Sequence, residues 1–179
     1  MPCTPSSATL RISRRALIAG ALVSLPGVAW AEKRESWKSY FNSRYGTSIE
    51  YPSRFKPGAA PDADDGLRFN SDDGAELAVW ASFNALDHDI PGLEDFLRES
   101  RKADEKITYR ATGKNWLVLS GTRGDKVFYT RYLLSHRNEV ENAFDISYPA
   151  ALAAAYDPIV ARIAKSLKGG RGFQTSGKP

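Results

Sequence analysis

Few residues of this 179-residue chain are able to act as nucleophiles, bases or metal ligands. Its only cysteine is Cys3, and its two histidines are His88 in LDHDIPG and His136 in LLSHRNE. Nucleophilic hydrolysis needs a hydroxyl or thiol held against a histidine that an acid orients. No serine stands in a Gly-x-Ser-x-Gly elbow. We therefore interpret both histidines as surface residues and predict no nucleophilic triad.

Acidic residues gather at two places that resemble metal sites. Asp87, His88 and Asp89 are adjacent, but sequence neighbours rarely converge on one ion without a distant third ligand. The segment PDADDG at 61–66 is similar to a calcium loop, yet its glycine comes one position early and the twelfth position is not glutamate. We interpret it as a solvated acidic loop and leave weak calcium binding open. No cofactor is predicted.

A group of charged residues shares the strand face opposite the predicted apolar one, because successive side chains of a strand alternate between faces. This face carries four candidate ligand-binding residues: Arg68, Arg110, Arg131 and Trp80. By the same parity it carries the acids Glu50, Glu76 and Asp145. One interpretation is a solvated face with cross-strand ion pairs. The other is a surface that binds an anion or a peptide through bidentate arginine donors.

The elements that must position these residues are mainly short strands. Apolar residues alternate in SIEYPSRF, and again on both sides of Asp73-Gly74, which predicts a hairpin over 66–83. The pattern repeats three times over 107–149, with turns at 113–115, 123–125 and 137–138. Strands joined by such tight turns are antiparallel. Arg-Gly-Asp at 123–125 is interpreted as turn chemistry and not as an adhesion motif.

Two helices are predicted beside these strands. In 91–104, Leu93, Phe96 and Leu97 form one apolar stripe. A longer apolar stripe runs over 152–168, where Asp157-Pro158 predicts a restart after a kink and Gly169 predicts the end. The predicted fold class is therefore α+β, an antiparallel sheet of about six to eight strands packed with two helices.

The first 31 residues are predicted to be a cleaved signal peptide. Arg14 and Arg15 precede an apolar run over 16–28, and AWA at 29–31 predicts cleavage after Ala31. The run is too short to span a bilayer permanently. We interpret the segment as a twin-arginine signal, with an ordinary secretory signal as the alternative. Either signal places the mature protein in the periplasm, without a membrane span.

The composition after cleavage excludes some classes of function. Removing residues 1–31 takes three arginines from the 25 basic residues and none from the 21 acidic ones, which leaves a net charge near +1. This is not the basic surface that nucleic-acid binding requires. Since Cys3 is lost, no disulfide forms. We expect a single domain over 32–168, a disordered tail over 169–179, and a monomer.

The stretch YFNSRYGTSIEYPSRFKPG, with the later hairpins and closing helix, resembles the PsbP-like superfamily. The resemblance rests on Tyr45-Gly46, Ile49, Tyr51-Pro52 and Phe55. That superfamily includes PsbP, the Ran-binding Mog proteins and DcrB-type envelope proteins. The chain also resembles exported proteobacterial proteins that share the YDPIV ending.

This resemblance implies an α/β/α-type antiparallel sandwich that acts by binding or assisting other proteins. The expected function is therefore a non-catalytic periplasmic binding or accessory role, with an envelope protein as partner. The alternative is a periplasmic hydrolase with a dispersed carboxylate and arginine site. That alternative requires a concave pocket in which a carboxylate and an arginine converge.

The export signal can be tested directly. Replacing both Arg14 and Arg15 by lysine should leave the precursor in the cytoplasm, because twin-arginine signals are read through this pair. Fractionation and immunoblotting measure the outcome, and Arg11→Lys, outside the pair, is the matched control. Normal export of the double variant would contradict the twin-arginine assignment and favour the ordinary secretory signal.

Overall fold

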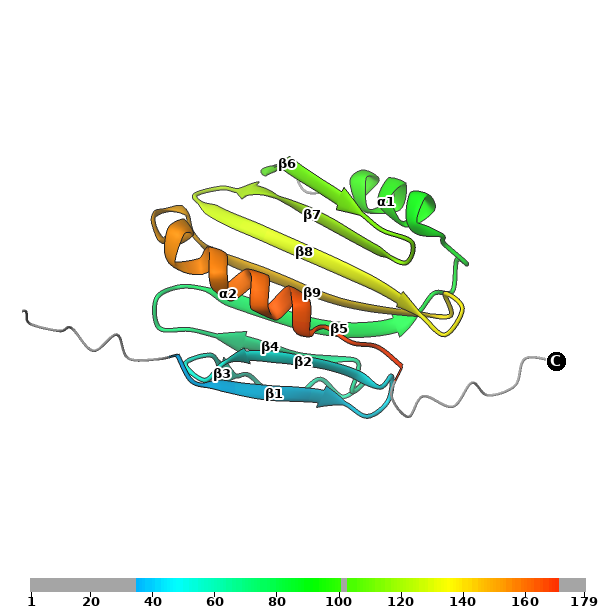
Figure 1. The fold of residues 1–179 in the computed structure, drawn as a ribbon, viewed down its shortest axis with the longest axis horizontal. Helices are drawn as coiled ribbons and strands as arrows, with labels where there is room; N and C mark the ends of the chain where they lie inside the picture. Colours follow the sequence, from blue (N-terminus) through cyan, green and yellow to red (C-terminus); the bar gives the residue numbers. More distant parts are fainter. Residues whose placement is uncertain (1–34, 101–102, 171–179) are drawn as a thin grey trace, which may run out of the picture. The chain divides into compact units, whose positions relative to one another are not determined.

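The computed structural model describes residues 35–100 and 103–170, and within them the chain forms nine strands and two α-helices (Figure 1). The first half contains β1 (Trp37–Asn42), β2 (Thr47–Pro52), β3 (Lys56–Pro57), β4 (Gly66–Asn70), β5 (Glu76–Phe83) and α1 (Ile90–Glu99). The second half contains β6 (Glu105–Thr112), β7 (Trp116–Arg123), β8 (Lys126–Ser135), β9 (Val140–Pro149), a 3₁₀ turn (Ala150–Leu152) and α2 (Ala153–Ser166). The predicted signal peptide and residues 171–179 lie outside the described residues.

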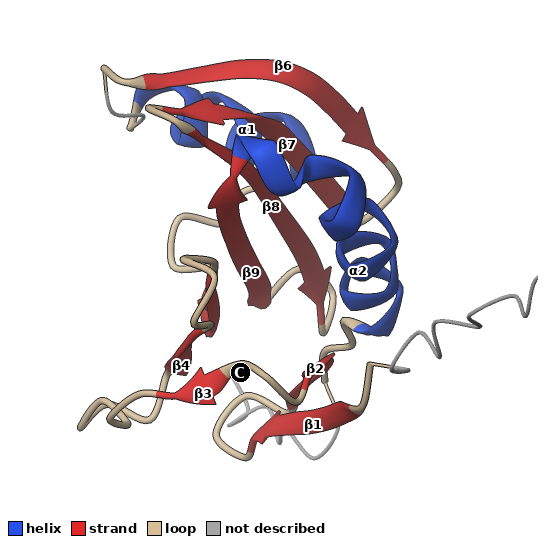
Figure 2. Ribbon diagram, turned by 90° about the vertical axis from the view of Figure 1, so that its left-hand side faces the viewer, coloured by secondary structure: helices blue, strands red, loops and turns tan. Residues whose placement is uncertain are grey.

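Seven of these strands form one antiparallel sheet in the order β3-β4-β5-β9-β8-β7-β6, and β1 pairs with β2 in a separate hairpin. The sheet twists from β6 at one edge to β3 at the other (Figure 2). The predicted antiparallel sheet of six to eight strands is confirmed, together with the hairpins joining β4 to β5 and β6 through β9. The strand β9 joins the two halves of the sheet, because it pairs with β5 on one side and with β8 on the other.

Both faces of the sheet carry an apolar core. Phe144 and Ile146 of β9 pack with α2, β2 and β5 on what we name the α2 face. Ala143 of the same strand packs with α1, Leu117 and Leu119 on the opposite α1 face. Within the described residues, no helix combines the length and apolar character needed to cross a membrane.

The structure differs from the predicted helix boundaries at α2. The helix runs through Pro158 without restarting, so the predicted break there is wrong. Because Pro158 lies in the second turn, its missing N–H removes one helical hydrogen bond and the rest of the helix is retained. The helix ends at Ser166, earlier than predicted, because Lys168 exchanges two backbone hydrogen bonds with Ser48 of β2.

Two smaller corrections concern the end of β5 and the end of α1. Phe83 is the last apolar residue of the alternating run that predicts the 66–83 hairpin and its buried face, but it is 53% exposed and its ring meets Tyr45 of the β1–β2 turn edge-on. The helix α1 ends at Glu99, where the Ser100 N–H donates to the Phe96 carbonyl, and the chain enters β6 at Glu105. The predicted helix over 91–104 is therefore shorter at its C-terminal end.

A fully buried asparagine ties the β1–β2 hairpin to the main sheet. The Asn142 side chain on β9 accepts a hydrogen bond from the Thr47 hydroxyl at 2.7 Å. Its amide donates to the Leu133 carbonyl at 3.0 Å and to the Ser135 hydroxyl at 2.9 Å. Since buried polar groups are costly unless paired, this side chain fixes the hairpin against β8 and β9.

A buried carboxylate holds α1 on the sheet. Oε1 of Glu94 accepts from Nε of Arg110 on β6 at 2.6 Å and from Arg98 at 2.9 Å, and Oε2 forms an ion pair with a terminal nitrogen of Arg110 at 2.6 Å. The Arg110 hydrogen bonds outweigh the effect of burial, so the pKa of Glu94 lies below its usual value. Glu94 is 6% exposed, so this helix buries one acidic side chain together with the apolar Ile90 and Leu93.

The role of Asn142 can be measured by its truncation. Asn142→Ala leaves the buried Thr47 hydroxyl without its acceptor and removes the amide bonds to Leu133 and Ser135, so we expect a loss of about 2 kcal/mol in the free energy of unfolding. Chemical denaturation monitored by circular dichroism measures this. The exposed Asn70 at the end of β4 is the control, and Asn70→Ala should change stability little. Equal effects of the two substitutions would contradict the assigned role.

The pairing of Glu94 with Arg110 predicts that stability is lost at low pH. Because the pKa of Glu94 is lower in the folded than in the unfolded chain, its stabilisation is complete above the unfolded value, ~4.3. The stabilisation is lost as the pH falls through the folded value. Glu94→Gln should therefore melt below the wild type at pH 7, and this difference should shrink towards pH 3. A difference independent of pH, measured by thermal unfolding, would contradict this assignment.

Candidate functional site

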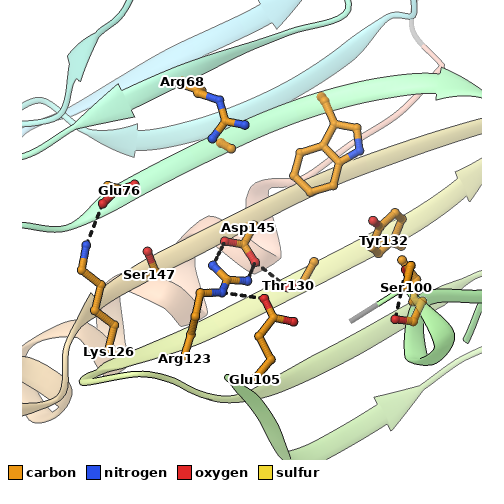
Figure 3. Close-up of a pocket in the computed structure, with 13 residues that line it drawn as sticks. Arg68, Glu76, Ser100, Glu105, Arg123, Lys126, Thr130, Tyr132, Asp145 and Ser147 are labelled. Carbon is orange, nitrogen blue, oxygen red and sulfur yellow. Dashed lines mark hydrogen bonds and ion pairs between the residues drawn. The ribbon is translucent and has the colours of Figure 1, made fainter. Parts of the chain in front are cut away.

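The α1 face is hollowed beside the C-terminal turn of α1. The cavity there has a volume of about 550 Å³ and crosses the sheet from Arg68 of β4 to Glu105 of β6. Its walls and floor include Arg68, Glu76, Trp80, Arg123, Tyr132 and Asp145 (Figure 3). We name this cavity the Arg68 groove. Its size falls within the range of about 300–1,000 Å³ typical of small-molecule sites.

An ion-pair network forms one side of the groove floor. The two terminal nitrogens of Arg123 face the two oxygens of Asp145 at 3.1 and 3.3 Å, and its Nε donates to Glu105 at 2.7 Å. The Thr130 hydroxyl donates to Asp145 at 2.6 Å. Burial lowers the pKa of Arg123, but its bonds with Asp145 and Glu105 outweigh that effect and raise it. The guanidinium of Arg123 is therefore paired with two carboxylates, those of Asp145 and Glu105.

A second ion pair closes one end of the groove, near the β7–β8 turn. Lys126 Nζ donates to Glu76 at 2.6 Å and to the Gly74 carbonyl at 3.1 Å. Figure 3 shows this pair on β8 and β5, beside the Arg123 network. Because Lys126 and Glu76 neutralise each other, neither contributes a free charge to the groove.

Arg68 is the exception among the charged residues of the groove. It is exposed on β4, and it forms no ion pair or side-chain hydrogen bond within residues 35–100 and 103–170. Figure 3 shows its guanidinium apart from both ion-paired groups. The sheet therefore presents one uncompensated guanidinium to any ligand in this groove.

A smaller cavity of about 350 Å³ continues from Arg68 under the 58–65 loop. Its lining includes Ala59, Pro61 and Leu67, and it shares Ala78 and Trp80 with the main groove. The Trp80 ring is half-buried and meets Tyr132 edge-on, with centroids 5.7 Å apart. At this point β4 and β5 lie so close that a Cβ on Gly66 would overlap the backbone of Val79 and Trp80.

The structure brings together two of the four candidate binding residues. Arg68 and Trp80 line the same groove, as the sequence pattern predicted. Arg110 lies on the same face, opposite Leu119 in the register, but it is engaged by Glu94 and does not line the groove. All four retain their ligand-binding roles only as predictions.

The predicted placement of Arg131 on this face is wrong. Arg131 pairs with Phe144, whose side chain belongs to the α2 face, and directly paired residues point to the same side of a sheet. The Arg131 guanidinium lies over the Trp116 ring, 4.8 Å from its centroid. Apolar residues of β8 face both cores, so parity alone did not identify which face was polar.

The acids predicted on this face are also divided by the structure. Glu76 and Asp145 line the groove, whereas Glu50 lies on β2 and pairs with Arg162 of α2 at 2.9 Å. Sequence reasoning missed Arg123, Lys126 and Glu105. The sequence pattern places Arg123 in a turn, whereas the registers of β7 with β8 and of β8 with β9 bring its guanidinium to Asp145.

The other candidate sites have structural roles. Asp89 caps α1 by accepting from the Gly92 N–H at 2.9 Å, and the acids of the 62–65 loop are exposed. His88 is not a surface residue as predicted, because its side chain is 17% exposed and lies against Glu141 and Phe96. Across the described ranges, no group of three or more histidines, cysteines and acids is placed to hold a metal ion.

The groove meets the geometric condition set for a hydrolase only in part. It is concave, and carboxylates converge there with an arginine. However, both oxygens of Asp145 are engaged by Arg123, and Oδ2 also accepts from Thr130. A general base needs a carboxylate within reach of a substrate proton. The arrangement therefore favours binding through Arg68 over proton transfer by Asp145.

Comparison with known proteins identifies the fold. The chain matches no protein-family model and no curated protein sequence. The solution structure of cyanobacterial PsbP (CyanoP) from Synechocystis sp. PCC 6803 has a TM-score of 0.58 and 16% identity, covering 84% of this chain and 100% of that one. The Saccharomyces cerevisiae Ran-binding protein Mog1p has a TM-score of 0.53 and 9% identity, covering 75% and 95%.

Identities this low establish the fold and nothing further. The resemblance in sequence had implied a PsbP/Mog-like arrangement of an antiparallel sheet and two helices, and the structure confirms it. This chain has the α+β fold of PsbP and Mog1.

Proposed function

We propose that this protein is a non-catalytic accessory protein of the periplasm that binds another envelope protein through the Arg68 groove. The observation that carries the proposal is the groove itself. Among the described residues that line this cavity, neighbouring charges are paired and one guanidinium beside a tryptophan is free. Arginine and tryptophan are enriched among the residues that dominate protein interfaces.

Protein binding agrees with the fold. Mog1p, which has the same fold, is described by its name as a protein that binds Ran. The groove of this chain lies on a rigid surface, since its residues come from strands β4 to β9 and from the end of α1. A preformed surface binds without the entropic cost of ordering a loop.

The proposed location rests on the predicted signal peptide at residues 1–31. Its Arg14-Arg15 pair, apolar run and AWA site support export, and removal of the segment leaves a chain of nearly balanced charge. We therefore expect the partner among envelope proteins and not among nucleic acids.

Site-specific photocrosslinking in the periplasm tests this function. A photoreactive amino acid at Ala78, on the groove floor, or at Ser100, at its α1 end, should yield the same adduct. The same residue at Ala161, on the exposed side of α2, is the matched control and should not yield it. Mass spectrometry identifies the adduct.

Two outcomes would contradict the proposed function. One is an equal yield of the adduct from Ala161, which would place the contact outside the groove. The other is the absence of any adduct from both groove positions while the exported protein is folded and abundant. Circular dichroism of the purified variants checks that each one is folded.

A further inference from the structure

We propose that the Arg68 groove recognises a polypeptide carboxylate that adjoins an apolar side chain. The carboxylate pairs with Arg68, and the apolar side chain enters the adjoining cavity between Trp80 and the 58–65 loop. This inference rests on the proposed function and specifies the chemistry of the partner.

The charges of the groove make Arg68 the anchor for an anion. Among the residues that the structure describes, three cations and three acids line the cavity, and the acids are paired with Arg123 and Lys126. An incoming carboxylate at Arg68 therefore need not break an existing ion pair. The planar guanidinium matches a carboxylate with two parallel hydrogen bonds, which a point charge such as lysine does not provide.

Asp65 favours a single negative charge over a double one at Arg68. This exposed acid lines the smaller cavity that the ligand enters, whereas Glu76 in the main groove is neutralised by Lys126. A phosphate dianion at Arg68 would meet stronger repulsion from Asp65 than a carboxylate would. The groove is therefore better matched to a carboxylate.

The neighbouring cavity explains why an apolar group should accompany the carboxylate. Arg68, Ala78 and Trp80 line both cavities, so a ligand bound at Arg68 reaches the smaller cavity directly. The smaller cavity is lined mainly by apolar groups, among them Ala59, Pro61 and Leu67. Burying an apolar side chain there contributes favourable free energy in proportion to the area removed from water.

Two parts of a polypeptide supply this chemistry. A free C-terminal residue carries its carboxylate and its side chain on one Cα, and an internal acidic residue next to an apolar one presents the same pair of groups. Capture of a terminal carboxylate is one of the recurring modes of peptide recognition. The experiment therefore uses both kinds of peptide.

Nuclear magnetic resonance titration of the exported chain provides the test. The probes are the peptide acetyl-Gly-Ser-Gly-Phe with a free carboxylate, the same peptide amidated, and amidated acetyl-Gly-Phe-Asp-Gly. We expect the Trp80 indole N–H signal to shift with at least one acidic peptide, at millimolar concentrations. The amidated Gly-Ser-Gly-Phe peptide should bind about tenfold more weakly or worse, because it lacks the charge-assisted bonds.

The variant Arg68→Gln should weaken binding of the acidic peptide by a similar factor of about ten, since it removes the guanidinium but keeps a polar, uncharged side chain. Arg137→Gln is the matched control, because Arg137 is an exposed arginine of the β8–β9 turn that does not line the groove. Binding by the free C-terminus alone identifies a terminal ligand. Binding by the internal aspartate identifies an internal one.

The inference is overturned if no acidic peptide shifts the Trp80 signal, or if Arg68→Gln and Arg137→Gln bind equally. It is also overturned if the amidated Gly-Ser-Gly-Phe peptide binds as tightly as the acidic peptide that shifts the signal. Repeating the photocrosslinking at Ala78 in the Arg68→Gln background separates this failure from failure of the proposed function. Adducts that persist there retain the groove as a protein-binding site and reject only the carboxylate anchor.

Discussion

The fold depends on the pairing of β9 with both β5 and β8. Its pairing with β5 joins segments that are far apart in sequence, and Leu77 lies opposite Ile146 there. Its pairing with β8 is a local hairpin contact. Alternation along β9 then serves both cores, because Phe144 and Ile146 face α2 whereas Ala143 faces α1. The same strand carries Asn142 to the hairpin and Asp145 to the groove.

The groove exists because α1 covers only part of its face. Glu94 binds Arg110 on the edge strand β6, which holds the helix over β6 to β8 and leaves β4 and β5 uncovered beyond Leu97. The exposed part of the sheet is stabilised by cross-strand ion pairs in place of an apolar cover, with Arg123 bound to Asp145 and Lys126 to Glu76. Arg68 lies beyond these pairs, on β4, and keeps its charge available.

Local patterns predicted the hairpins well, and the errors arose at strands whose two faces are both buried. The turn at Asp73-Gly74 and the three turns from 113 to 138 were found from turn residues between alternating runs. Arg131 was misplaced because β8 is packed on both faces, so its apolar residues occur at both parities. A bulge between Ile107 and Tyr109 also shifts the register of β6, and it puts Arg110 on the same face as Ile107.

The sequence by itself determined the α+β class, the antiparallel hairpins and the choice of Arg68 and Trp80, because these depend on alternation and turn chemistry within short segments. Only the tertiary structure decided which charges remain unpaired. Arg123 reaches Asp145 and Arg110 reaches Glu94 through contacts between separate elements, whose register no local pattern specifies. The distinction between a solvated charged face and a groove with one free arginine therefore required the folded chain.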